Sequence, residues 1–232
     1  MKFTLEDPQV RLGFSERVDG SMVWWNRLPV PAPVQESRDT YFRQQGIDPS
    51  RVVAGGCAHT TNVRVVGEDD AGTYIPNSDS LITNQPNLFL SITAADCMPV
   101  YFSDAKHQTI GIAHAGWRGL VAGILENVVH GMTEMFGSAP EDIQVLIGPH
   151  IKKCHFEIGK EVAVKFLPKH IETHEGRLYA DMSNEARSRL LSVGVRTIVD
   201  PSVCTVCQAD ILFSARTDRH DPLEGAVAYI GR

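Results

Sequence analysis

Hydrophobic residues recur along this chain with two different periods, and the period changes near residue 119. Ahead of that point, short runs rich in Val, Ile and Phe are bounded by turn-forming residues, as buried strands are. From Gly119 to Phe136 the apolar residues follow helical spacing instead, so the pattern predicts one amphipathic helix over 119–136. The strand-like runs are RVVAGG, NVRVVG, LFLSITA, MPVYFS and TIGIAHA.

The remaining pattern predicts further strands and short helices. Strands are expected in IQVLIGP, RTIVD and AVAYIG, and helices over about 35–45, over 159–168, and from an N-cap at Ser183 to Gly194. This order is neither a regular βαβ alternation nor all-β, which favours an α+β fold with mixed sheets and outer helices. Because the chain has no repeat, low-complexity tract or long linker, we expect a single domain over 1–232.

Composition and the first residues of the chain limit which partners and which cellular compartment we expect. No run approaches the roughly 20 apolar residues of a membrane span. The opening MKFTLEDPQV lacks the basic-then-apolar form of a signal peptide, so we expect a cytoplasmic protein with no membrane partner. The formal net charge is -6 without a basic stripe, which argues against nucleic acid as a partner.

The cysteines suggest reduced thiols. Five of them, at positions 57, 97, 154, 204 and 207, form an odd and scattered set. Without an export signal, such thiols are available for metal binding or catalysis. The CTVC pair at 204–207 could be a redox or metal pair, although one such pair alone is weak evidence.

One segment, ADCMPVYFSDAKHQTIGIAHAG, places a cysteine and a histidine where they could share a metal or a proton. If it forms a hairpin with its turn at 105–106, Asp104 lies opposite His107 and Cys97 lies opposite His114. Directly opposed residues share a face, with Cβ atoms about 4.5–5.5 Å apart. A shift of one residue would place the two side chains on opposite faces.

A third residue completes a candidate site. His59, in GGCAHTTNV, lies between two predicted strands. Two imidazoles and one thiolate bind zinc and leave one position open for water or substrate. The alternative is that His59 and His114 are satisfied interior histidines and that Cys97 is a small apolar core residue.

Three more polar residues have two interpretations each. Asp96 could orient an imidazole or cap a turn. Arg118 follows HAGW, where it could hold an anion such as phosphate or form a salt bridge. Asp79 in NSDSLIT is more typical of a turn or cap residue than of a catalyst.

Several stretches together resemble the signatures of the YfiH-like family. They are ADCMPVYF, HAGWRGLVAGILE, IGPHIKKCHFEIGKEV and CTVC followed by LFSARTD, and GFSERVDG and NSDSLIT extend the likeness to nearly the whole chain. ADC followed at this distance by HAGWRG is a specific signal. Members of the family carry the labels laccase-domain protein, polyphenol oxidase, peptidoglycan editing factor and purine nucleoside phosphorylase.

The resemblance implies a fold and a set of site residues. The fold is a layered α/β/β/α arrangement with mixed sheets, shared with the deamidase domain of cytotoxic necrotising factor toxins. The implied metal ligands are His59, Cys97 and His114, with zinc as the usual metal and copper as the other candidate. The implied catalytic residues are Cys97, His114, Arg118 and Asp96, and the substrate or phosphate contacts are Arg17, Asn26, Asp79, Arg118 and Arg216.

The activity implied by the resemblance is that of a zinc-dependent purine nucleoside phosphorylase. It would act on adenosine, inosine, guanosine or methylthioadenosine with phosphate, and would also deaminate adenosine. The partners are therefore a nucleoside and phosphate, and the protein is expected to be a monomer or a small homo-oligomer.

Three alternatives stay open. The first is a copper phenol oxidase, although laccase chemistry needs about ten ligands, many as His-x-His pairs, and the nine histidines contain no such pair. The second is a Cys97–His114 hydrolase or deamidase with a thiolate nucleophile. The third is a zinc-stabilised binding module with a closed, four-ligand site, in which Cys57 could be the fourth ligand. Cys57 itself departs from the family pattern, since CAHT stands where Gln-Val-His-Gly is usual.

Overall fold

Two β-sheets pack face to face between outer helices. The computed structural model describes residues 1, 3–23, 30–218 and 223–232. One sheet has six strands in the order β13 (Thr197–Val199), β9 (Gln144–Ile147), β7 (Met98–Asp104), β8 (Thr109–Ala115), β5 (Ser80–Thr83) and β3 (Val63–Val65). The other has five strands in the order β1 (Arg11–Phe14), β14 (Ala226–Gly231), β6 (Phe89–Ala94), β2 (Val52–Gly55) and β4 (Tyr74–Ile75).

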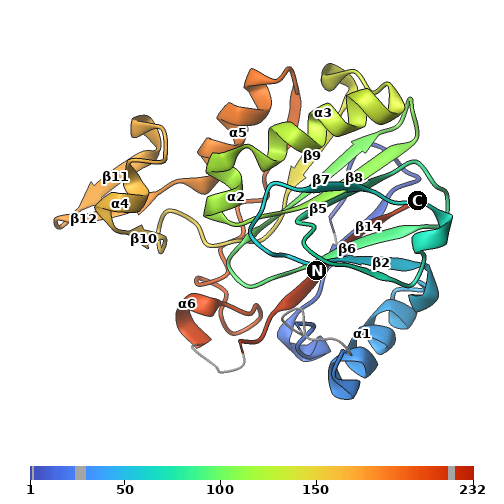
Figure 1. Cartoon of the computed structure of the whole chain (residues 1–232). Helices are drawn as coiled ribbons and strands as arrows, with labels where there is room; N and C mark the ends of the chain where they lie inside the picture. Colours follow the sequence, from blue (N-terminus) through green and yellow to red (C-terminus); the bar gives the residue numbers. More distant parts are fainter. Residues whose placement is uncertain (2, 24–29, 219–222) are drawn as a thin grey trace.

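Helices cover both outer faces of this pair of sheets. Figure 1 shows α2 (Trp117–Ala122), α3 (Ile124–Phe136) and α5 (Met182–Ser192) over the six-stranded sheet, and α1 (Ala32–Gln44) beyond the five-stranded sheet. Parallel and antiparallel pairs occur in both sheets. The predicted α+β fold with layers α/β/β/α is therefore confirmed. None of the helices in the described ranges combines the length and apolar character that a membrane span requires.

The central strands read as continuous apolar runs because both of their faces are buried. All residues of β7 and β8 are buried. Along β7, Val100 and Phe102 pack with the residues of α3, whereas Tyr101 packs in the core between the two sheets. A strand with two covered faces has no polar side, so its sequence shows no alternation.

The predicted helix over 119–136 is wrong in one respect. The chain forms two helices, α2 and α3, which meet at Gly123. Gly123 has a φ of 98°, in the left-handed region that closes a helix. The apolar spacing continues across the break because both helices bury residues against the same sheet. The spacing of apolar residues therefore predicts one helix where the chain forms two.

A similar small correction applies to α5. Its N-cap is Asp181, whose carboxylate accepts a hydrogen bond from the backbone N–H of Asn184, rather than Ser183. Both residues are good caps. The hydroxyl of Ser183 instead bonds Lys152 and His150.

The predicted hairpin forms, but its predicted register is wrong. Pro99, rather than Cys97, lies opposite His114, and Asp104 pairs with Thr109. The turn takes four residues, 105–108, because the Asp104 carboxylate accepts hydrogen bonds from two backbone N–H groups within it, and Gln108 has a φ of 55°. The partner shifts by two residues, which preserves the face, so Cys97 still lies beside His114.

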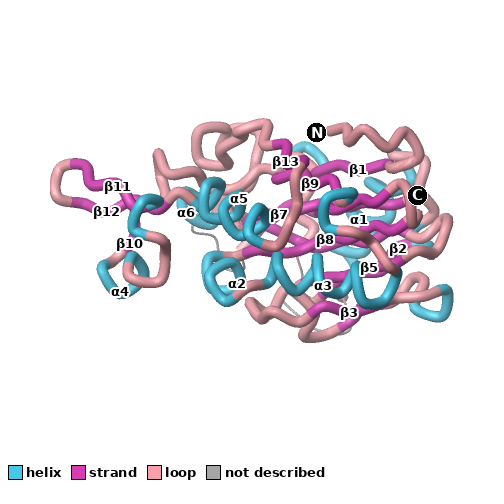
Figure 2. The backbone as a smooth tube through the Cα atoms, turned by 90° about the horizontal axis from the view of Figure 1, so that it is seen from above, coloured by secondary structure: helices cyan, strands magenta, loops and turns pink. Residues whose placement is uncertain are grey.

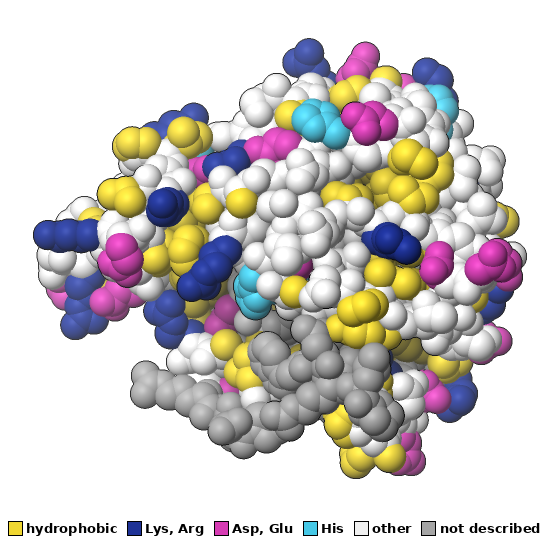
Figure 3. Space-filling model, in the orientation of Figure 1, with side chains coloured by type: hydrophobic (Ala, Val, Ile, Leu, Met, Phe, Trp, Pro, Cys, Tyr) yellow, Lys and Arg dark blue, Asp and Glu magenta, His cyan; other side chains and the backbone are white. Residues whose placement is uncertain are grey.

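A small arm projects from this layered body. It contains β10 (Glu157–Ile158), β12 (Arg177–Ala180) and β11 (Ile171–His174) in one sheet, together with α4 (Lys160–Ala163), which is shorter than the helix predicted over 159–168. Figures 1 and 2 show the arm extending from one end of the molecule in two perpendicular views. Its surface in Figure 3 carries basic, acidic and hydrophobic side chains side by side.

Candidate metal centre

The structure brings together the three residues that the sequence selects. One ligand atom each from His59, Cys97 and His114 can be chosen so that all lie within 4.8 Å of one another. The Cys97 sulfur is 3.8 Å from Nε2 of His59, and the centroids of the two imidazoles are 4.9 Å apart. His59 lies in the loop after β2, Cys97 directly before β7, and His114 near the end of β8.

Asp79 orients both imidazole-bearing segments. Its buried carboxylate is 2.8 Å from Nδ1 of His114, and it accepts hydrogen bonds from the backbone N–H groups of His59 and Thr60 and from the Thr60 hydroxyl. With Nδ1–H donating to Asp79, Nε2 is the nitrogen of His114 that is left to bind a metal once it has lost its proton. His59 has a φ of 59°, a conformation that needs such support.

This finding reverses the expected roles of two aspartates. We expected Asp79 to be a turn or cap residue or, from the resemblance, a substrate contact, and Asp96 to orient an imidazole, cap a turn or, from the resemblance, act in catalysis. Asp79 directly precedes β5, and Ser80 pairs with Ala113 of β8, so Asp79 lies beside His114. Only this long-range pairing reveals the contact, and the local sequence has no signal for it.

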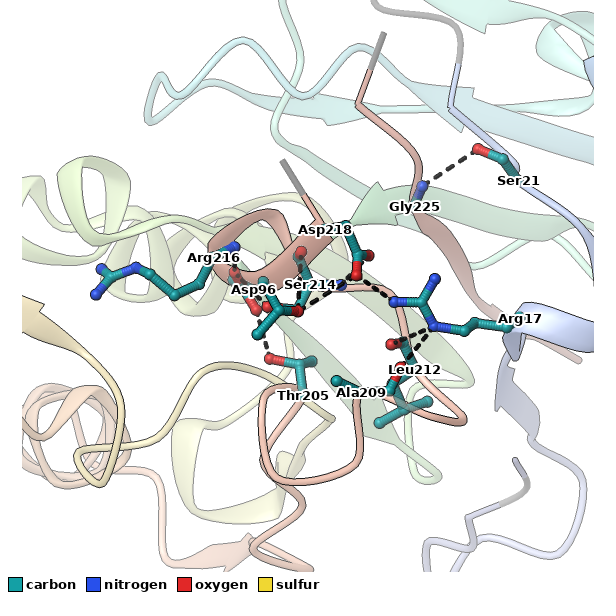
Figure 4. A network of polar contacts seen from close by, with 11 residues as sticks. Arg17, Ser21, Asp96, Thr205, Ala209, Leu212, Ser214, Arg216, Asp218 and Gly225 are labelled. Carbon is teal, nitrogen blue, oxygen red and sulfur yellow. Dashed lines mark hydrogen bonds and ion pairs between the residues drawn. The ribbon is translucent and has the colours of Figure 1, made fainter. Parts of the chain in front are cut away.

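Asp96 instead holds the chain that leads into Cys97. Its carboxylate accepts hydrogen bonds from the Thr205 hydroxyl at 2.5 Å, the Ser214 hydroxyl at 3.0 Å and the backbone N–H of Arg216 at 2.8 Å, as Figure 4 shows. Asp96 has a φ of 74°, which is unusual for a residue with a side chain. It therefore serves as a positioning residue for Cys97.

The electrostatics of the cluster favour a thiolate. Burial by itself raises the pKa of the Cys97 thiol, but the charge of His114 and hydrogen bonds with His114 and His59 lower that pKa to about 6. Burial lowers the pKa of His114, but its interactions with Cys57, Cys97 and Asp79 raise that pKa well above its ordinary value. Without a metal, the Cys97 thiolate is therefore paired with an imidazolium at His114, and metal binding would displace the proton from Nε2 of that ring.

Cys57 lies close by but outside the ligand set. Its thiol contacts the carbonyl oxygens of Gly55 and Thr93, each at 3.6 Å. Burial raises the pKa of this thiol, so it stays protonated. The expectation that Cys57 could serve as a fourth ligand is therefore wrong for this arrangement, and the cluster keeps three ligands among the described residues.

A cavity of about 180 Å³ opens against the cluster. His59, Cys97 and His114 form part of its wall, and most of the remaining wall is apolar or backbone. A cavity with a few polar groups among apolar walls is typical of small-molecule sites. The other described lining residues are Val23, Gly55, Gly56, Cys57, Tyr74, Thr93, Ala94, Ala95, Ala215 and Leu223.

The donor set fits zinc. Tetrahedral zinc, with Zn–S of ~2.3 Å and Zn–N of ~2.0 Å, separates a sulfur from a nitrogen ligand by ~3.5 Å. The 3.8 Å between Cys97 and His59 is close to this value. Three ligands would leave one coordination position, and the cavity lies against the cluster.

The predicted anion-binding arginines lie outside the described cavity wall. Arg17 donates from Nε to the carbonyl oxygens of Ala209 and Leu212 and pairs with Asp218. Figure 4 shows its guanidinium within this network. Arg118 is exposed, with its guanidinium 4.4 Å from the Trp117 ring.

Arg216 points away from Asp96 toward the arm, where its guanidinium donates to the carbonyl oxygens of His155 and Glu157 at 3.2 Å each. Asn26 lies outside the described residues. The roles of all four residues toward a substrate or phosphate stay predictions.

Gly116 is a site residue that the sequence analysis missed. A Cβ at this position would lie 2.9 Å from Cδ2 of His59 and 3.1 Å from the Cys97 sulfur. We expect Gly116→Ala to displace these ligands and weaken zinc binding about 10-fold or more, as measured by competition with a chelator. Gly67→Ala is the matched control, since a Cβ there meets nothing within 4 Å. Equal zinc affinity in the two variants would contradict this steric role.

Comparisons with known proteins agree with the family resemblance and with the fold. Residues 27–230 match the family model described as "Multi-copper polyphenol oxidoreductase laccase". The chain is 33% identical over 196 residues to the purine nucleoside phosphorylase YfiH of Escherichia coli K12, covering 82% of this chain and 77% of that protein. It is 29% identical over 200 residues to adenosine deaminase RL5 of an unknown prokaryotic organism, covering 79% and 76%. The crystal structure of the Bacillus licheniformis hypothetical protein YfiH superposes with a TM-score of 0.88 at 29% identity, covering 97% of this chain and 94% of that one.

Proposed function

Because this chain belongs to the multi-copper polyphenol oxidoreductase laccase family, we propose that it is a zinc-dependent enzyme of purine nucleosides. It cleaves adenosine, inosine, guanosine or methylthioadenosine with phosphate, and it deaminates adenosine with water. Relatives named for these two activities support the proposal.

One observation carries the proposal. His59, Cys97 and His114 offer three ligands beside a cavity, without a fourth ligand residue in the cluster that the described residues form. Structural zinc sites are closed by four protein ligands, whereas catalytic sites keep a position for water or substrate. The arrangement therefore favours an enzyme over the binding-module alternative.

The chain's own residues prepare the site for this chemistry. Asp79 holds His114 in the tautomer that offers Nε2 to the cluster, and Asp96 holds the backbone that presents Cys97. The apolar walls formed by Val23 and Ala94 suit a flat purine and exclude water from it. When bound, zinc would supply a Lewis acid and a water molecule with a pKa of ~7.

The first experiment follows adenosine with the purified, zinc-loaded protein. With phosphate we expect adenine and ribose 1-phosphate, and with or without phosphate we expect some inosine, all resolved by chromatography. Cleavage that needs no phosphate would contradict the phosphorylase, and the absence of turnover of every one of the four nucleosides would overturn the proposal. If the copper-loaded protein oxidises a phenol and no nucleoside is turned over, the oxidase alternative is favoured.

Arg118 is the candidate for the phosphate contact. Since a guanidinium pairs with phosphate through two hydrogen bonds, we expect Arg118→Ala to raise the KM for phosphate ~10-fold or more, with the zinc content unchanged. Arg64→Ala, which removes an exposed arginine on β3, is the control. An unchanged dependence on phosphate in Arg118→Ala would place the anion site elsewhere.

The Cys97 thiolate supports a second candidate function, a cysteine hydrolase or deamidase. A pKa of about 6 leaves Cys97 ionised at neutral pH, as a nucleophile requires. Alkylation separates the two functions. The zinc enzyme is protected at Cys97 while zinc is bound and loses its activity when zinc is removed, whereas the cysteine hydrolase works without metal and is inactivated by alkylation.

A further inference from the structure

A second cluster of soft ligands lies apart from the cavity. Cys154 and His155 precede β10, and Cys204 and Cys207 belong to the CTVC pair. One ligand atom from each of these four residues lies within 4.8 Å of all the others. None of the four lines the cavity beside His114.

The distances within this cluster match a tetrahedron. The Cys154 sulfur is 3.7 Å from the sulfurs of both Cys204 and Cys207. Nδ1 of His155 is 3.2, 3.8 and 3.5 Å from the sulfurs of Cys154, Cys204 and Cys207. Tetrahedral zinc, with Zn–S of ~2.3 Å and Zn–N of ~2.0 Å, separates two sulfurs by ~3.8 Å and a sulfur from a nitrogen by ~3.5 Å. The observed spacing is thus the one that four zinc ligands adopt.

The same distances exclude a disulfide in this arrangement. Bonded sulfurs lie ~2.05 Å apart, whereas Cys154 is 3.7 Å from each of its neighbours and all three cysteines are free. A redox-active dithiol needs only two cysteines, whereas this cluster has three cysteine sulfurs around one imidazole. A set of three thiolates and one imidazole is a common donor set of structural zinc.

The backbone builds this arrangement from distant parts of the chain. His150 and Cys204 form a β-bridge, the Thr205 N–H donates to the His150 carbonyl, and the His150 N–H donates to the Val203 carbonyl. Cys154 and Cys204 are 50 residues apart in the sequence. A cross-link that closes a long loop removes much conformational freedom from the unfolded chain.

The segment that the cluster would fasten also supports the first site. Thr205 and Ser214 bond Asp96, the residue before Cys97, and the Arg216 side chain bonds the carbonyl of His155. Figure 4 shows Thr205, Ser214 and the Arg216 backbone converging on Asp96. The cluster therefore lies where the projecting arm, the 204–216 segment and the approach to Cys97 meet.

We propose that Cys154, His155, Cys204 and Cys207 bind a second zinc ion in a closed, four-ligand structural site. This zinc fastens the arm to the 204–216 segment. Because all four positions come from the protein, the site takes no substrate.

The test is the zinc content of the chain after reconstitution under reducing conditions and desalting. We expect two zinc ions per chain in the wild type and one in the double variant Cys154→Ser with Cys207→Ser, whose two side chains are exposed. Cys57→Ser is the matched control, since Cys57 belongs to neither cluster, and it should retain two.

A conservative variant keeps the test decisive if the double variant folds poorly. Cys207→His retains a zinc ligand and should retain two zinc ions per chain, whereas Cys207→Ala should release the second ion to a chelator at least 10-fold more readily. Cobalt substituted for zinc in Cys97→Ala should show thiolate-to-cobalt absorption from the second site alone. A single zinc per chain in the wild type that is lost in Cys97→Ala, two zinc ions in the double variant, or a disulfide among these cysteines in reduced protein would each overturn the proposal.

Discussion

Replacing His114 with alanine is expected to remove one zinc ion per chain and to reduce nucleoside turnover to background. His114 is the most buried of the three ligands beside the cavity, and its Nδ1 is tied to Asp79 at 2.8 Å. With two ligands left, the site can no longer hold the metal firmly, because tight catalytic zinc sites use three protein ligands. The lost hydrogen bond and the space left by the ring should also lower the free energy of unfolding by ~1–3 kcal/mol.

The measurement combines zinc content, nucleoside turnover and thermal unfolding. His130→Ala is the matched control, since His130 is an exposed histidine of α3 that lies outside both clusters. It should retain zinc and activity. If His114→Ala folds and keeps both its full zinc content and its turnover, the metal centre is not the one formed with His59 and Cys97.

The second large effect is expected at Asp79. Its buried carboxylate accepts four hydrogen bonds, from His114, from the backbone of His59, and from the backbone and hydroxyl of Thr60. Asp79→Ala leaves these donors unpaired in the interior, and removing one member of a buried charged pair costs ~3–5 kcal/mol of stability. We therefore expect much of this variant to be unfolded or strongly destabilised.

Asp79→Asn separates orientation from folding. The Asn side chain nearly preserves the shape of Asp. Its NH2 group donates hydrogen bonds rather than accepting them, so the side chain cannot satisfy all four donors. Loss of such an outer partner of a metal-binding histidine typically lowers metal affinity ~10–100-fold. Chelator competition measures this loss, with Asp142→Asn as the control, since Asp142 pairs with Lys106 at the exposed surface. Unchanged zinc affinity in Asp79→Asn would show that Asp79 does not orient the ligand.

Much of the fold follows from local patterns. Runs such as MPVYFS and TIGIAHA predict strands because β7 and β8 are covered on both faces, and a doubly covered strand must be apolar throughout. The break at Gly123 and the four-residue turn before Thr109 escaped prediction. Both depend on backbone conformations that hydrophobic spacing does not encode.

The first cluster was accessible from the sequence because its residues are rare in buried strands. A histidine within TIGIAHA and a cysteine before MPVYFS have few structural reasons to be there, and their separation suits a hairpin. The predicted register of the hairpin was wrong by two residues. Cys97 and His114 still lie on the same face of the sheet, since only a shift by an odd number of residues moves a side chain to the other face. The family resemblance pointed to the same three residues.

The sequence by itself predicted the α+β class, most of the central strands, and the trio of His59, Cys97 and His114, and the family resemblance added the layered arrangement. Only the tertiary structure decided that Asp79 rather than Asp96 orients His114, that Cys57 stays outside the cluster, and that the CTVC pair meets Cys154 and His155. The physical reason is distance along the chain. Periodicity reports the burial of neighbouring residues, whereas these contacts join segments 35 to 120 residues apart, and such segments meet only through the pairing of strands and the closing of loops.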